Sequence, residues 1–188
     1  MIRQVHYFDK PGKENTEKCV EITACMVDEG YKHIVVATTA GDTGVAMARK
    51  LQGKDVNLVV VTHSFGFKEP NHFELLPEKR EEIVMLGGKV YTCTILTHSI
   101  ETAFTQKFNG LYPTMIVAQS LRRFGEGAKV CCEIVMEACD GGLIPEFEKV
   151  VAVAGTGRGA DTVCIIKSAT SKRFLDLKVL EILAKPRE

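Results

Sequence analysis

The chain has 188 residues, of which 45% are hydrophobic and 26% charged, and its 24 basic residues balance 24 acidic ones. A chain of this length can bury an ordinary core, so we expect a single domain over residues 1–188. The even charge balance lacks the basic footprint of nucleic-acid binders, and no apolar run reaches the roughly 18 residues that cross a bilayer. We therefore expect neither nucleic acid nor a membrane as a main partner.

In chain order, the apolar periodicity predicts alternating strands and helices. We expect strands at 5–8, 33–38, 56–62, 89–94, 150–154, 162–166 and 177–184, and helices at 16–29, 43–52, 77–86, 98–107, 113–124 and 126–140. Short strands that alternate with helices are typical of a largely parallel sheet covered on both faces. We therefore expect an α/β fold, a three-layer α/β/α sandwich with a mixed, mostly parallel sheet.

Two strands depart from the parallel pattern. Residues 150–154 and 162–166 are separated by only seven residues, which is too few for a parallel crossover. They should form an antiparallel hairpin late in the chain. The last apolar segment, 177–184, is expected to be an edge strand.

The N-terminal residues 1–18 show no apolar segment of a secretory signal, so we expect a cytoplasmic protein. In that compartment the seven cysteines should be reduced thiols. Cys131, Cys132 and Cys139 lie in an apolar run with helical spacing, and no C-x-x-C pair occurs. We interpret the cysteines as buried small hydrophobic residues and expect no metal site.

The first candidate site is the turn between the strand at 33–38 and the following helix. A helix N-terminus offers free backbone N–H groups and the positive end of the helix dipole, both of which favour an anion. Glycines allow close approach to the backbone, and threonine hydroxyls add donors. The alternative is an ordinary turn with Asp42 or Thr43 as the N-cap. The candidate anion-binding residues are Thr38, Thr39, Gly41, Asp42, Thr43 and Gly44.

A second candidate loop follows the strand at 56–62 and contains Thr62, His63, Gly66 and Phe67. Histidine can hydrogen-bond a ligand or transfer protons near neutral pH, and an aromatic ring can stack on a flat one. The loop runs on to Pro77, and long loops in compact domains are often functional. The alternative is that its aromatic residues only cover the edge of the core.

A third candidate is the glycine-rich turn of the predicted hairpin, formed by Gly155, Thr156, Gly157, Arg158, Gly159 and Asp161. A tight hairpin needs fewer glycines than this. The guanidinium of Arg158 could hold a phosphate through its planar set of donors. A flexible hairpin with an incidental arginine is the alternative.

Acid–base residues form a fourth, weaker group. Glu133, Glu137 and Asp140 share one face of the helix predicted at 126–140, where an apolar setting could raise a carboxyl pKa. The alternative is that Glu133 pairs with an arginine or caps a neighbouring loop. His98 follows the strand at 89–94 and lies near the same sheet edge.

Several blocks in order resemble stand-alone members of the pyruvate kinase C-terminal α/β-domain-like family. The blocks are YFDKPGKENTE at 7–17, VVATTAGDT at 35–43, VVVTHSFGF at 59–67, KVCCEI at 129–134, GADT at 159–162 and FLDLKVLEILAKPR at 174–187. The resemblance implies a three-layer α/β/α domain. It also implies flavin mononucleotide (FMN) as a bound ligand, with contacts from the turns at 38–43, 62–67 and 159–162.

The sequence therefore predicts a protein that binds a phosphorylated small molecule, with FMN as the first candidate and its phosphate at Gly41–Gly44. A regulatory domain that binds a sugar phosphate without chemistry is the first alternative. An enzyme that uses His63, His98 or Glu133 as acid or base is the second. The sequence leaves open the reaction, if there is one, and a homo-oligomeric state.

Overall fold

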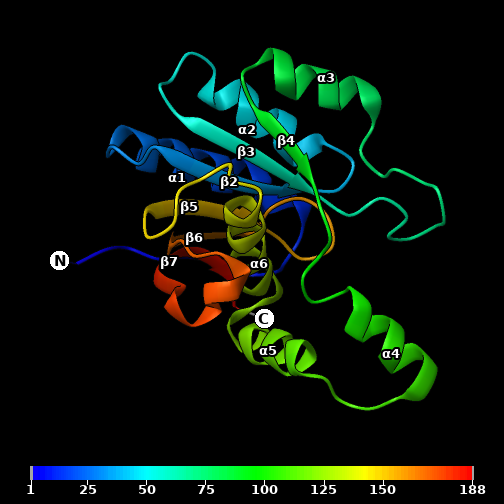
Figure 1. Ribbon diagram of the computed structural model, residues 1–188. Coiled ribbons are helices and arrows are strands. Elements are labelled where there is room, and N and C mark those ends of the chain that lie inside the picture. The colour runs from blue at the N-terminus through cyan, green and yellow to red at the C-terminus, as the bar shows by residue number, and fades with distance from the viewer. Residues whose placement is uncertain (1, 188) are drawn as a thin grey trace.

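Seven strands form one sheet in the computed structural model, which describes residues 2–187 (Figure 1). Their order across the sheet is β1-β7-β6-β5-β2-β3-β4. The strands are β1 (His6–Phe8), β2 (His33–Thr38), β3 (Asn57–Thr62), β4 (Lys89–Thr92), β5 (Lys149–Ala154), β6 (Thr162–Lys167) and β7 (Lys178–Pro186). Strand β6 runs antiparallel to both of its neighbours, and the other pairs are parallel. The predicted mixed, mostly parallel sheet and its late hairpin are confirmed.

Helices cover the sheet on both faces. Helices α1 (Thr16–Asp28), α2 (Asp42–Leu51) and α3 (Pro77–Met85) pack on one face, and α6 (Glu126–Asp140) lies on the other (Figure 1). Helices α4 (Ile100–Phe108) and α5 (Pro113–Leu121) extend beyond the sheet, and 3₁₀ turns occupy Lys13–Asn15, Arg122–Phe124 and Ser171–Asp176.

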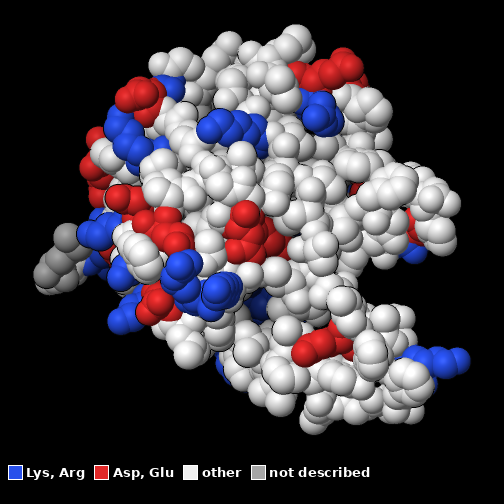
Figure 2. Space-filling model, viewed as in Figure 1, with Lys and Arg blue, Asp and Glu red and all other residues white. Residues whose placement is uncertain are grey.

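Within residues 2–187, no helix has the length and apolarity needed to cross a membrane. Basic and acidic side chains are interspersed on the face in Figure 2.

The central strands are buried on both faces, which explains their nearly continuous apolar sequences. In β2, Ile34 and Val36 belong to the core under α1 and α2, whereas Val35 belongs to the core under α6. Five of the seven cysteines are buried and all seven are free thiols, as expected, although Cys25 is exposed.

The expectation that residues 177–184 form an edge strand is wrong. Strand β7 lies inside the sheet, between β6 and β1, and the edges are β1 and β4. The short strand β1 pairs in parallel with the far end of the chain, with His6 opposite Ala184. A three-residue strand whose partner is so distant in sequence leaves no local signal that would identify the pair.

Helix α2 approaches the sheet closely at Gly44. A Cβ atom at this position would lie 2.8 Å from Cδ1 of Ile83 on α3 and 2.8 Å from Cγ1 of Val60 on β3. Because no ordinary Cβ contact is this short, a side chain here must push the helix or its neighbours away. The glycine therefore sets how close the first turn of α2 lies to β3 and α3.

We expect Gly44→Ala to lower the free energy of unfolding by about 1–3 kcal/mol through overpacking. Ile83→Val, which removes Cδ1, should cost about 0.5–1.5 kcal/mol alone. In the Gly44→Ala background it should cost less, because it relieves one of the two short contacts. Urea unfolding of the two single variants and the double variant measures this coupling, and strictly additive losses would contradict the packing argument.

Candidate functional site

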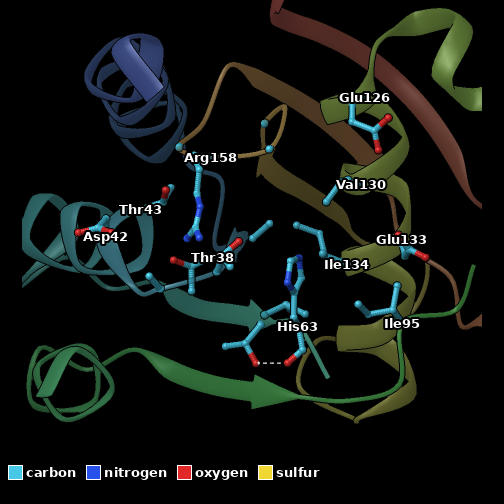
Figure 3. Close-up of a pocket in the computed structure, with 18 of the residues that line it drawn as sticks. Thr38, Asp42, Thr43, His63, Ile95, Glu126, Val130, Glu133, Ile134 and Arg158 are labelled. Atoms are coloured by element: carbon cyan, nitrogen blue, oxygen red, sulfur yellow. Dashed lines mark hydrogen bonds between the residues drawn. The ribbon is translucent and has the colours of Figure 1, made fainter. Parts of the chain in front are cut away.

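A cavity of about 820 Å³ opens at the edge where the parallel strands β2, β3 and β5 end (Figure 3). The first turn of α2 forms one wall, α6 forms the opposite wall, and the loop between β5 and β6 lies between them. All three predicted loops contribute to it. The predicted residues that line it are Thr38, Thr39, Asp42, Thr43, Thr62, His63, Phe67, Gly155, Gly157, Arg158 and Gly159.

Five predicted residues, Gly41, Gly44, Gly66, Thr156 and Asp161, are not among the lining residues. They shape the loops instead. Gly41 has φ +108°, and a Cβ there would lie 2.6 Å from Cβ of Lys79 on α3. Gly66 has φ +76°, a backbone conformation that favours glycine.

The first turn of α2 has no side-chain cap. Gly41 occupies the N-cap position, and no side-chain hydrogen bond caps the helix there. The alternative that Asp42 or Thr43 caps the helix is therefore wrong: the Asp42 carboxylate forms an ion pair with Lys79 on α3 instead. Thr38 Oγ1 accepts a hydrogen bond from Gly44 N at 3.4 Å, and the buried Thr43 faces the cavity. The N–H groups of Asp42 and Thr43 have no acceptor within their own helix, so they can meet an anion.

The loop between β5 and β6 is fixed by the buried carboxylate of Asp161. Its Oδ2 accepts hydrogen bonds from Thr156 N at 2.9 Å and Gly12 N at 3.2 Å, and its Oδ1 accepts one from Thr162 Oγ1 at 2.8 Å. The loop also folds back on itself, because a Cβ at Gly155 would lie 2.5 Å from the carbonyl oxygen of Gly159. The predicted site residue Asp161 thus supports the loop from behind.

Arg158 extends from this loop toward Thr38 and Thr43 (Figure 3). Lys13 and Thr16, from the turn that precedes α1 and its first residue, line the same end of the cavity as the loop. Thr16 Oγ1 accepts a hydrogen bond from Ala160 N at 2.9 Å. Sequence analysis missed Lys13 and Thr16, because only the folded chain brings the turn before α1 beside the loop.

His63 and Phe67 are held together at the end of β3. Their ring centroids are 4.4 Å apart, and the Phe67 ring lies 6.0 Å from that of His98. His63 Nδ1 lies 2.7 Å from Oε2 of Glu74. Burial raises the Glu74 pKa, but the hydrogen bonds and charges of His63 and Lys68 outweigh it and lower the pKa overall. With Nδ1 donating to this carboxylate, Nε2 is the ring nitrogen left to face a ligand.

On the α6 wall, Glu133 is committed to structural contacts. It forms a buried ion pair with Lys129, one turn earlier, and its Oε1 accepts hydrogen bonds from the Thr97 N and Oγ1, both at 2.8 Å. The pairing with an arginine is wrong, since the cation is a lysine, but the capping of a neighbouring loop is confirmed. Lys129 stands four residues before Glu133, a spacing that could have predicted the pair.

Glu137, one turn further along α6, also lines the cavity and is 3% exposed. Burial first, and then the charge of Glu133, raise its pKa from the ordinary value of 4.5 to about 8. Its Oε1 accepts a hydrogen bond from Leu96 N at 3.3 Å. Asp140, expected on the same face, lies outside the cavity and accepts a hydrogen bond from Ser171 N at 2.9 Å.

The chain matches the family model described as the pyruvate kinase alpha/beta domain over residues 19–166. The protein belongs to this family. The match runs from α1 to β6 and includes the three loops of the cavity. The predicted resemblance and the fold class that it implies are thereby confirmed for this pyruvate kinase α/β-domain protein.

One solved structure found to be similar is a crystal structure of O-ureido-L-serine synthase. It shares 17% sequence identity with this pyruvate kinase α/β-domain protein over 64% of the chain, with a TM-score of 0.31. The aligned region covers 38% of the synthase chain. At this level the likeness carries no argument about function.

The raised pKa of Glu137 makes the stability of this pyruvate kinase α/β-domain protein depend on pH. The folded protein keeps a proton that the unfolded chain releases above about pH 4.5. Relative to Glu137→Gln, the free energy of unfolding of the wild type should therefore fall between pH 4.5 and about 8. The expected slope is up to about 1.4 kcal/mol per pH unit.

Urea unfolding at about pH 5, 6, 7 and 8 measures the difference in the free energy of unfolding between the wild type and Glu137→Gln. Glu81→Gln on the exposed side of α3 is the control for the loss of one surface charge. A constant difference between the wild type and Glu137→Gln across the series would rule out a protonated Glu137.

Proposed function

We propose that the protein binds a phosphorylated small molecule, with FMN as the first candidate, and that the phosphate lies at the Gly41–Gly44 turn. The observation that carries the proposal is the set of donors at one end of the cavity. Asp42 and Thr43 in the first turn of α2 border the same space as the side chains of Arg158 and Lys13. Helix N-termini and arginine guanidinium groups are the donors that phosphates prefer.

The other end of the cavity suits a flat, mostly apolar ring. Ile95, Val130 and Ile134 line it beside the paired rings of His63 and Phe67. The volume of about 820 Å³ falls in the usual range of small-molecule sites, about 300–1,000 Å³. A flavin held here would supply electron- or hydride-transfer chemistry, and this chain's residues would bind and orient it.

Arg158→Ala should weaken FMN binding about tenfold or more, because a charge-assisted bond to phosphate is worth roughly 1.5–3 kcal/mol. Quenching of flavin fluorescence on titration with protein measures the dissociation constant. Riboflavin, which lacks the phosphate, should bind the wild type more weakly than FMN does. Arg158→Ala should reduce the difference in affinity between FMN and riboflavin.

Arg123→Ala is the matched control, since Arg123 is exposed and does not line the cavity. It should leave both affinities unchanged. Equal affinity of the wild type for FMN and riboflavin would contradict a phosphate site at this turn. A thermal shift with sugar bisphosphates but none with flavin would favour the regulatory alternative.

A further inference from the structure

The two ends of the cavity differ in charge. Arg158 and Lys13 border the end formed by the α2 turn, where the carboxylate of Asp42 is occupied by Lys79. That end can therefore receive an anion. The opposite wall, on α6 and the turn before it, carries three carboxyl groups and two cations, which are Glu126, Glu133, Glu137, Arg122 and Lys129.

Both cations of the α6 wall are already paired. Arg122 donates to Glu126 from Nε at 2.6 Å and from Nη2 at 3.2 Å, and Lys129 is paired with Glu133. For Glu137 no ion pair is found within residues 2–187. Its Oε1 accepts a hydrogen bond from Leu96 N, and the Cys93 thiol lies near enough to lower its pKa. Among residues 2–187, a second phosphate placed against this wall would meet carboxyl groups and only cations that are already paired.

A buried carboxyl group without a cation favours its neutral form, which has an O–H to donate. Glu137 is buried and lies one turn from Glu133, which pairs with Lys129, so a second negative charge at Glu137 is unfavourable. In its neutral form, Glu137 has an O–H that it can donate to a ligand in the cavity that it lines. Cys93 keeps its own proton, because burial first raises its pKa to about 12.

We propose that the cavity selects molecules with one phosphate and an uncharged hydrogen-bond acceptor at the other end, and that the Glu137 carboxyl group donates to this acceptor. The selection rests on the proposed phosphate site and adds to it a limit on the ligand class. Bisphosphates, which carry an anion at both ends, are disfavoured. The site thus separates monophosphates, FMN and sugar monophosphates alike, from bisphosphates.

The charged and titratable groups around Glu137 come from three elements. On its own helix and on the segments packed against it, these are Lys129, Glu133, Asp140, Tyr91 and Cys93, and His63 and His98 also line the cavity. Lys129 and Glu133 offset each other, and Asp140 lies outside the cavity. Between pH 7 and 9, Glu137 is the group on this wall whose change of charge we expect to dominate.

Isothermal titration calorimetry at pH 7 and at pH 9 tests the proposal. The ligands are FMN, fructose 6-phosphate and fructose 1,6-bisphosphate. The proteins are the wild type, Glu137→Gln and the control Asp140→Asn, which makes the same change on α6 outside the cavity. With ionisation near pH 8, FMN affinity of the wild type should fall about tenfold between the two pH values. The affinity of Glu137→Gln for FMN should be the same at pH 7 and at pH 9, because the amide donates a hydrogen bond at both pH values.

The FMN affinity of Asp140→Asn should fall between pH 7 and pH 9 as that of the wild type does. At pH 7, fructose 6-phosphate should bind more tightly than fructose 1,6-bisphosphate. A bisphosphate that binds as tightly as the monophosphate would overturn the proposed selection while leaving the phosphate site in place. Equal changes in the FMN affinity of the wild type and of Glu137→Gln between pH 7 and pH 9 would also overturn the proposed selection and leave the phosphate site in place. If none of the three compounds binds at either pH, the phosphate site and the selection both fail.

Discussion

The in-register parallel pairing of β4, β3, β2 and β5 is the constraint on which the site depends. Thr38 pairs with Thr62, and Thr62 with Thr92, so these strands end at one level. The hydroxyls of Thr62 and Thr92 lie 2.6 Å apart across that edge. Parallel strands expose their carboxyl ends together, and ligands of open α/β sheets bind there. Every loop that leaves these strands is therefore brought to one cavity.

The reversal at β6 adds the remaining side of this cavity. Because β5 and β6 form a hairpin, the loop between them stays at the carboxyl edge of β5 and does not cross over the sheet as a helix. Asp161 then fixes the loop to the turn at Gly12. Arg158 can reach toward α2 only because this short connection stays at the edge.

The elements could largely be predicted from the sequence, since buried parallel strands and amphipathic helices leave strong local patterns. The pairing of β1 with β7 could not, because it depends on contacts between the two ends of the chain. For the same reason Lys13 could not be predicted as a site residue, because only the folded chain brings it to the cavity. The three loops could be predicted, and the four-residue spacing of Lys129 and Glu133 could have indicated their ion pair. That Gly44 serves packing could not be predicted, because its close neighbours come from other elements. FMN stays a prediction.

The link between Gly12 and Asp161 has a consequence for how the protein is made. Strand β1 and the turn after it are synthesised well before their partners, which are β7 and the loop before β6. The elements between them can begin to pack before this N-terminal segment can pair with its partners. Because the turn at Gly12 is held by Asp161, nascent chains halted before Asp161 should lack a finished binding pocket.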